Sequence, residues 1–169
     1  MHKILYIFGT RHEYQRPDPK LAKNQVAAFE DELIKICSKL SICVLSEENN
    51  IEAQKERGLP DSIAWKVAQS ISISHLYCDP DRAQRNVAGI RQANDVRIAG
   101  FFDDLGEDEI ASQIDESYKL RELFWLNEIG KKGMWPILLV CGANHVQSLA
   151  EQAGSMGIQV HVLYEDWHA

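Results

Sequence analysis

Short runs of apolar residues alternate along the chain with longer segments whose apolar positions recur at helical spacing. Between residues 19 and 40, apolar positions follow one another at intervals of three or four, so they lie along one stripe of a helix. An alternation of strands and helices predicts a parallel sheet with crossover helices. We therefore expect an α/β fold, a three-layer sandwich with a mostly parallel sheet of about five strands. The runs that predict these strands are 3–8, 41–45, 74–78, 136–141 and 158–163.

Helix-breaking and helix-capping residues indicate where two further helical segments begin or are interrupted. Residues 49–69 predict a broken helical stretch, because Gly58 and Pro60 interrupt it. Residues 79–98 predict one helix, since the Asp-Pro pair at its start suits an N-cap and a first helical position.

The carboxyl-terminal half predicts a long helix followed by two strands of different character. Residues 106–130 are acidic at their start and are followed by Lys131 and Lys132, as the helix dipole favours. The run 136–141 is almost wholly apolar, which is typical of a central parallel strand buried on both faces. The run 158–163 alternates and predicts an edge strand.

Length and charge narrow the class of protein. The chain has 169 residues, which suits one domain over 1–169. A net charge of −7 argues against partners such as nucleic acid or an anionic membrane surface. The four cysteines have no C-x-x-C spacing, and no apolar run is long enough to cross a bilayer. We expect a soluble, cytoplasmic protein with free thiols.

Polar residues gather directly after four of the predicted strands. In an open parallel sheet, ligands bind outside the carboxyl ends of the strands, so these residues are the candidate site. Two of the segments repeat one pattern, Gly-x-x-His, in which glycine lets the backbone turn sharply beside a ligand. The segments are Gly9-Thr10-Arg11-His12-Glu13, Ser46-Glu47-Glu48, Asp79-Pro80-Asp81-Arg82 and Gly142-Ala143-Asn144-His145.

Two histidines and nearby carboxylates at one sheet edge allow more than one chemistry. His12 and His145 could hold a divalent metal, namely Mn, Co or Zn, or they could act as a general acid and base without metal. Glu13, Glu47 or Glu48 would complete the metal shell or serve as the base. The structural alternative is that both histidines are hydrogen-bonded residues of the fold.

Basic and polar residues beside the predicted crevice indicate the kind of substrate. Arg11, Asp81, Arg82 and Asn144 are the candidate substrate-binding residues, and arginine suits a carboxylate or phosphate group. The expected partner is therefore a small molecule or peptide that carries an anionic group.

With these residues in view, the chain resembles the superfamily that joins the TraB/GumN and Tiki proteins, the erythromycin esterases and the ChaN-like proteins. The resemblance rests on the motifs GTRH (residues 9–12) and GANH (142–145), on a glutamate that closes the second strand, on Arg121, and on the pair Asp81-Arg82. The chain is shorter than typical members. Arg11 and Asn144 are also larger than the residues often found at those positions.

The resemblance implies a shared site but not a single reaction. The superfamily includes metal-dependent proteases, esterases that use a histidine base without an obligatory metal, and haem-binding proteins. The pair of Gly-x-x-His motifs at strand ends makes a hydrolase of ester or peptide bonds our leading hypothesis, in which Arg121 and Arg82 bind an anionic substrate group or stabilise an oxyanion.

Two other hypotheses remain open from the sequence. One is a non-catalytic binding or sensor domain for a small anionic ligand, since no serine has a G-x-S-x-G context. The other is an interaction protein whose histidines are structural. Neither a P-loop nor a G-x-G-x-x-G pattern is present, which argues against nucleotide hydrolysis of that type and against a dinucleotide site.

Overall fold

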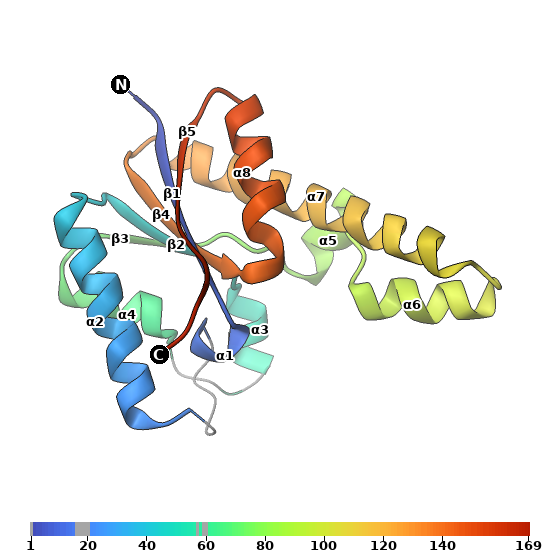
Figure 1. Cartoon of the computed structure of the whole chain (residues 1–169), viewed down its shortest axis with the longest axis horizontal. Helices are drawn as coiled ribbons and strands as arrows, with labels where there is room; N and C mark the ends of the chain where they lie inside the picture. The colour runs from blue at the N-terminus through green and yellow to red at the C-terminus, as the bar shows by residue number, and fades with distance from the viewer. Residues whose placement is uncertain (1, 16–20, 57, 59–60) are drawn as a thin grey trace.

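The computed structural model describes residues 2–15, 21–56, 58 and 61–169 of the chain. Within them, five parallel strands form one sheet in the order β3-β2-β4-β1-β5 (Figure 1). Helices pack on both faces of this sheet, so the predicted three-layer α/β sandwich is confirmed. The strands are β1 (Ile4–Thr10), β2 (Val44–Glu47), β3 (Ser74–Tyr77), β4 (Ile137–Gly142) and β5 (Gln159–Trp167).

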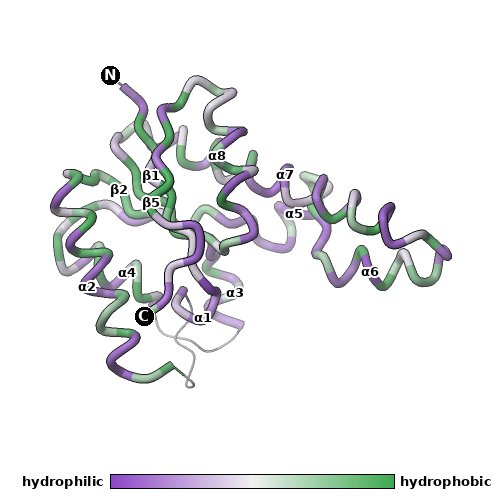
Figure 2. The backbone as a smooth tube through the Cα atoms, viewed as in Figure 1, coloured by the Kyte–Doolittle hydropathy of each residue, from purple (hydrophilic) through white to green (hydrophobic). Residues whose placement is uncertain are grey.

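Strand position follows the apolar pattern of the sequence. All six residues of β4 are buried, because the strand lies between β1 and β2 and is covered by helices on both faces. The strand β5 is more exposed and lies at an edge, as its alternating pattern predicts. Figure 2 shows the apolar residues gathered in the central part of the sheet.

Each face of the sheet has its own apolar core. On one face lie α7 (Glu107–Lys132) and α8 (Val146–Ser155), which contribute Trp125 and Leu149. On the other lie α2 (Lys23–Lys39), which contributes Phe29, and α4 (Ile63–Ser70), which contributes Val67. The two clusters together cover both faces of the sheet with apolar side chains. Polar residues therefore lie at the ends of the strands.

The single helix predicted over 79–98 is wrong. The structure has two helices instead, α5 (Arg82–Ala88) and α6 (Ala93–Phe102). Asp81 is the N-cap of α5 and accepts a hydrogen bond from the backbone N–H of Gln84 at 2.8 Å. Gly89 adopts a left-handed conformation with φ of 69° and ends α5, a backbone shape that glycine adopts at little cost.

Other boundaries differ by a few residues. β2 begins at Val44, three residues later than predicted, because Ser41 turns the chain with φ of 50°. The stretch 49–69 is indeed broken, into α3 (Ile51–Glu56) and α4, with Gly58 at a positive φ between them. Pro60 and the predicted helix start at Pro19 lie outside the described residues.

Three short elements were not predicted from the pattern. They are α1 (His12–Gln15), the 3-10 helix η1 (Ala143–His145) and α8. The first two contain the histidines of the Gly-x-x-His motifs, so each motif continues from its strand directly into a helical turn. The long helix predicted over 106–130 is confirmed as α7, which continues to Lys132.

Two further features concern the thiols and the length of the apolar helices. All four cysteines have free thiols, and burial raises the pKa of the Cys37 thiol to about 12. No helix in the described part of the chain is both long enough and apolar enough to span a bilayer.

Candidate functional site

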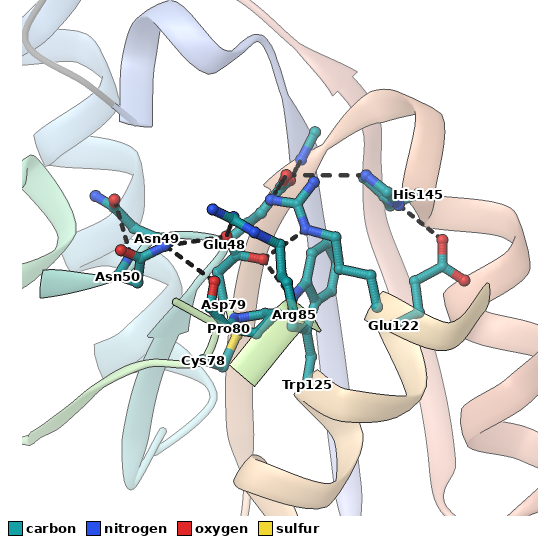
Figure 3. A network of polar contacts seen from close by, with 12 residues as sticks. Glu48, Asn49, Asn50, Cys78, Asp79, Pro80, Arg85, Glu122, Trp125 and His145 are labelled. Atoms are coloured by element: carbon teal, nitrogen blue, oxygen red, sulfur yellow. Dashed lines mark hydrogen bonds and ion pairs between the residues drawn. The ribbon is translucent and has the colours of Figure 1, made fainter. Parts of the chain in front are cut away.

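The carboxyl ends of β1, β2 and β4 lie side by side at one edge of the sheet and bring the segments that follow them together (Figure 3). Glu48 directly follows β2, Gly142 ends β4, and His12 follows β1. Because these strands are neighbours and parallel, the residues after them meet above the sheet edge. The strand-end rule therefore correctly predicts that these residues lie close together.

Glu48 lies at the centre of this site. Its side chain is buried, with the residue 1% exposed, and its Oε2 accepts a hydrogen bond of 2.7 Å from the backbone N–H of Gly142. The other oxygen, Oε1, lies 3.1 Å from Nη2 of Arg121 and 3.8 Å from Nε2 of His145. A buried carboxylate is costly unless it has such partners, and here a cation and a backbone donor supply them.

His12 approaches Glu48 over the backbone of Gly142. A Cβ atom at position 142 would lie 3.0 Å from His12 Nε2 and 3.3 Å from Glu48 Oε2. The imidazole and the carboxylate therefore both approach residue 142 so closely that they leave no room for a side chain there. His12 itself is exposed, so its ring is accessible from solvent.

His145 is held more rigidly and lies behind Glu48. It is 3% exposed, and its Nδ1 lies 2.7 Å from Oε1 of Glu122. The imidazole ring packs between Tyr118 and Trp125, at centroid distances of 4.7 and 4.8 Å. Glu122 bonds the Nδ1 side of the ring, so the Nε2 side faces Glu48.

Glu122 is buried with a full set of donors. Besides His145, it accepts hydrogen bonds from Ser148 Oγ at 2.8 Å and from Gln152 Nε2 at 2.6 Å. These two donors come from α8, so the orientation of His145 depends on the packing of α7 against α8. The arrangement is a fixed support rather than a mobile pair.

Arg121 joins Glu48 to a second carboxylate, Asp79. Its Nε donates to Asp79 Oδ1 at 2.5 Å, and the same oxygen accepts a hydrogen bond from Trp125 Nε1 at 3.0 Å. Burial alone would lower the pKa of Arg121, but Glu48 and Asp79 together raise it above its usual value. The guanidinium therefore remains charged and holds both carboxylates in place.

A polar cavity of about 290 Å³ opens beside this cluster. Glu48, His12 and Tyr118 form part of its wall. Three further arginines line it, and two of them have carboxylate neighbours: Arg82 bonds Glu56 at 2.9 Å, and Arg85 lies 3.7 Å from Asp79. The third arginine, Arg91, bonds the neutral Gln113 at 3.1 Å and has no ion pair among the described residues.

The charges of this wall favour an anionic ligand. Four arginines line it, Arg82, Arg85, Arg91 and Arg121, against the three carboxylates Glu48, Glu56 and Asp79, so the wall has an excess of one positive charge. Guanidinium groups bind carboxylate and phosphate oxygens with paired hydrogen bonds. The cavity is therefore locally basic in a chain with a net charge of −7.

Other predicted residues lie on the far side of His12. Arg11, Glu13 and Asn144 line a second cavity of about 350 Å³, which His12 also borders. None of these three residues lines the basic cavity. His12 thus stands between two hollows, and only one of them contains Glu48.

The structure separates Glu47 from Glu48, although they are adjacent in sequence. Glu47 is completely buried and bonds the Ser62 hydroxyl and, at 2.8 Å, Nε2 of His75. It does not line the basic cavity. Asp81 is likewise placed in a helix cap, so neither residue shares the site of Glu48 and His12.

Few side chains at this site are placed to bind a metal ion. In the described ranges, no three His, Cys, Asp or Glu side chains converge closely enough to hold a metal ion. Arg121 already bonds the Glu48 oxygen nearest to His145, and its positive charge would oppose a cation there. The metal site of His12 and His145 stays a prediction.

Three residues of the site were not among the candidates from sequence: Tyr118, Glu122 and Trp125. They lie with the predicted Arg121 at helical spacing along α7. Asp79, two residues after β3, belongs to one of the strand-end segments that the sequence singled out, although no role was assigned to it. A glutamate within the buried stripe of a helix was the available signal for Glu122.

Comparison of the chain with protein-family models, curated proteins and solved structures gives no match. The resemblance to the TraB/GumN superfamily therefore rests on the two motifs and their placement at the strand ends.

Proposed function

We propose that this chain is a hydrolase that cleaves an ester or peptide bond in a small anionic substrate. The observation that carries the proposal is the convergence of His12 Nε2 and Glu48 Oε2 on Gly142, in the wall of a basic cavity that both residues line. An imidazole and a carboxylate so placed can activate water next to a bound ligand.

In this proposal, His12 is the general base and Glu48 positions the water. The imidazole removes a proton from water as the oxygen attacks the carbonyl carbon, and the new C–O bond forms. The bond to the leaving group then breaks, and the leaving group takes the proton from His12. Arg82 and Arg91 bind the anionic part of the substrate through charge-assisted hydrogen bonds.

His145 and Arg121 are positioning residues in this scheme. His145 is buried, and Glu122 fixes its ring so that Nε2 faces Glu48. Arg121 bonds both the Glu48 and the Asp79 carboxylates and holds them in place. Neither side chain needs to exchange protons with the substrate, so both act on the reaction through Glu48.

The two Gly-x-x-His motifs also suggest a second mechanism for the hydrolase, one that depends on a metal ion. A Mn, Co or Zn ion between His12 and His145 would polarise the carbonyl and activate the water. Activity that a chelator removes and one of these ions restores would support this variant. Activity that a chelator leaves unchanged would support the acid-base form.

A non-catalytic domain that binds a small anion is the second candidate, because Arg91 faces the cavity without an ion pair among the described residues. This function needs the arginines but not His12. It predicts thermal stabilisation by an organic anion that persists in His12→Ala and is lost in Arg91→Ala.

The deciding experiment measures hydrolysis of an anionic chromogenic ester, the p-nitrophenyl monoester of a dicarboxylic acid, and of a peptide p-nitroanilide. We expect wild-type activity on at least one of them and a loss of roughly 10²-fold or more in His12→Ala. His161→Ala is the matched control, because His161 is exposed on β5 and stacks on Tyr6, remote from the strand-end cluster. Equal rates in wild type and His12→Ala would overturn the proposal.

A further inference from the structure

His12, the proposed base, borders two cavities, and the mechanism proposed above uses only one of them. The basic cavity contains Glu48 and takes the anionic part of the substrate. The second cavity has a volume of about 350 Å³ and is bordered by His12 and Gly142 but not by Glu48. Hydrolysis divides a substrate into an acid and a leaving group, and the basic cavity accounts for the acid alone.

The wall of the second cavity comes from the two Gly-x-x-His motifs and from the end of β5. Arg11 lies within the first motif, and Glu13 directly follows it. Asn144 lies within the second motif, and Asp166 is a residue of β5. All four residues are exposed, so a ligand that enters the cavity can reach their side chains.

The end of β5 is held closely against the end of β1, which fixes Asp166 beside the cavity. A Cβ atom at Gly9 would clash with the backbone oxygen of Glu165, so glycine lets the two strands approach. The hydroxyl of Thr10 donates a hydrogen bond of 2.9 Å to the backbone oxygen of Trp167. The same end of β5 lies beside α1 (Figure 1). These contacts fix the backbone on both sides of Asp166.

The two cavities that meet at His12 are opposite in charge. The wall of the basic cavity has an excess of one positive charge. In the second cavity, with His12 counted as neutral, the described residues supply one arginine, Arg11, against the two carboxylates Glu13 and Asp166. A substrate with an anionic group on one side of its scissile bond and a cationic group on the other is complementary to both cavities.

We propose that the second cavity binds the leaving group and that this group is an amine with a further positive charge. This assignment rests on the proposed hydrolase and narrows its substrate to an amide whose acyl part is anionic and whose amine part is cationic. An alcohol acquires no charge when it leaves an ester. A released amine is protonated at neutral pH and can pair with Glu13 and Asp166.

The reaction then places one product in each cavity. His12 takes a proton from water as the water oxygen bonds to the carbonyl carbon. The C–N bond breaks, its electron pair stays on the nitrogen, and the nitrogen takes the proton from His12. The acid product loses its remaining proton to solvent, and the amine product gains one from solvent. The carboxylate lies among the arginines of the basic cavity, and the ammonium lies against Glu13 and Asp166.

Two monoamides of glutaric acid test the proposal, one formed with 1,3-diaminopropane and one with butylamine. Both keep the free carboxylate of the acyl part. The two amines have equal length, so the substrates differ only in the terminal ammonium. Chromatography of the released glutarate measures both reactions. In wild type, we expect kcat/KM for the diaminopropane amide to exceed that for the butylamide by about fivefold, as two exposed ion pairs would give.

Three variants test which side chains produce this preference. Glu13→Gln/Asp166→Asn should abolish it, and Arg11→Gln should increase it by removing the positive charge from the cavity wall. Glu165→Gln is the matched control, because Glu165 is an exposed carboxylate next to Asp166 that does not line the cavity. It should keep the wild-type preference, and thermal unfolding should show that all variants remain folded.

Each contrary result overturns a defined part of the account. Equal cleavage of both amides by wild type, or a preference that persists in Glu13→Gln/Asp166→Asn, would overturn the cationic leaving group and leave the proposed hydrolase standing. Cleavage of the anionic p-nitrophenyl ester but of neither amide would do the same. Cleavage of none of the three substrates would overturn the proposed hydrolase and the leaving-group assignment together.

Discussion

Glu47 and Glu48 are adjacent in the sequence, are both buried, and each have a histidine as neighbour, yet they belong to different kinds of structure. Glu47 faces Ser62 and His75, at the N-terminus of α4 and on the edge strand β3. Glu48 faces Gly142 and Arg121 at the end of β4. The first cluster is closed around its carboxylate, whereas the second borders a cavity.

The comparison shows that a buried carboxylate next to a histidine does not by itself make a site. At Glu47, the hydroxyl of Ser62 also accepts a hydrogen bond from the backbone N–H of Trp65, so the cluster fixes the start of α4. At Glu48, a guanidinium and a backbone N–H hold the carboxylate while His12 remains accessible. Access and a reactive neighbour distinguish the candidate site from the structural cluster.

The largest effect on the Glu48 cluster should come from Arg121→Met. Removing this cation leaves the buried carboxylates of Glu48 and Asp79 without their shared partner, so we expect a loss of about 3 kcal/mol in the free energy of unfolding. Urea denaturation measures it. His75→Ala, which leaves Glu47 its hydrogen bond from Ser62, should cost less, and an equal or larger loss there would contradict the ranking.

Gly142→Ala should separate activity from stability within the site. The added Cβ would lie 2.9 Å from Cε1 of His12. His12 is exposed and can move aside cheaply, but it then leaves its position beside Glu48. We expect the rate to fall about tenfold or more with little change in the unfolding midpoint. Gly154→Ala, at a helical glycine with no atom near its Cβ position, is the control.

Ser62→Ala should have the opposite signature. It removes the N-cap of α4 and a hydrogen-bond donor to the buried Glu47, so we expect a loss of roughly 1–2 kcal/mol in unfolding free energy. The rate of ester hydrolysis by the folded protein should stay within about twofold of wild type. A large fall in rate at full folding would show that the Glu47 cluster takes part in the chemistry.

Arg91→Ala should produce the smallest change and affect substrate binding alone. Arg91 lines the basic cavity but lies outside the Glu48 cluster, so we expect KM for the anionic ester to rise severalfold while kcat changes little. The neutral ester p-nitrophenyl acetate serves as the comparison substrate. An equal rise in KM for both esters would argue against recognition of the anionic group.

Much of the fold follows from local pattern, whereas the site follows only in part. The apolar runs identify all five strands, because buried parallel strands need continuous apolar side chains. The strand-end rule locates His12 and Glu48. It does not choose between Glu47 and Glu48, since successive residues point to opposite sides and only the packed helices decide which side holds the cavity.

The two Gly-x-x-His motifs illustrate the same limit. Their sequences are alike, but His12 begins α1 at the surface, while His145 is covered by Tyr118 and Trp125 of α7. That difference arises from the packing of a helix distant in sequence, which no local pattern contains. Asp79 shows a related case, because its bond to Arg121 spans forty-two positions of the chain and leaves Asp81 to cap α5.

The most direct test of the account compares Glu48→Gln with Glu47→Gln in the hydrolysis of the same anionic p-nitrophenyl ester. Both changes keep the size of the side chain and remove its negative charge. We predict that Glu48→Gln lowers kcat/KM by roughly 10²-fold or more, whereas folded Glu47→Gln stays close to wild type. Equal rates for the two variants, or a larger loss in Glu47→Gln, would contradict the assignment of the site to Glu48.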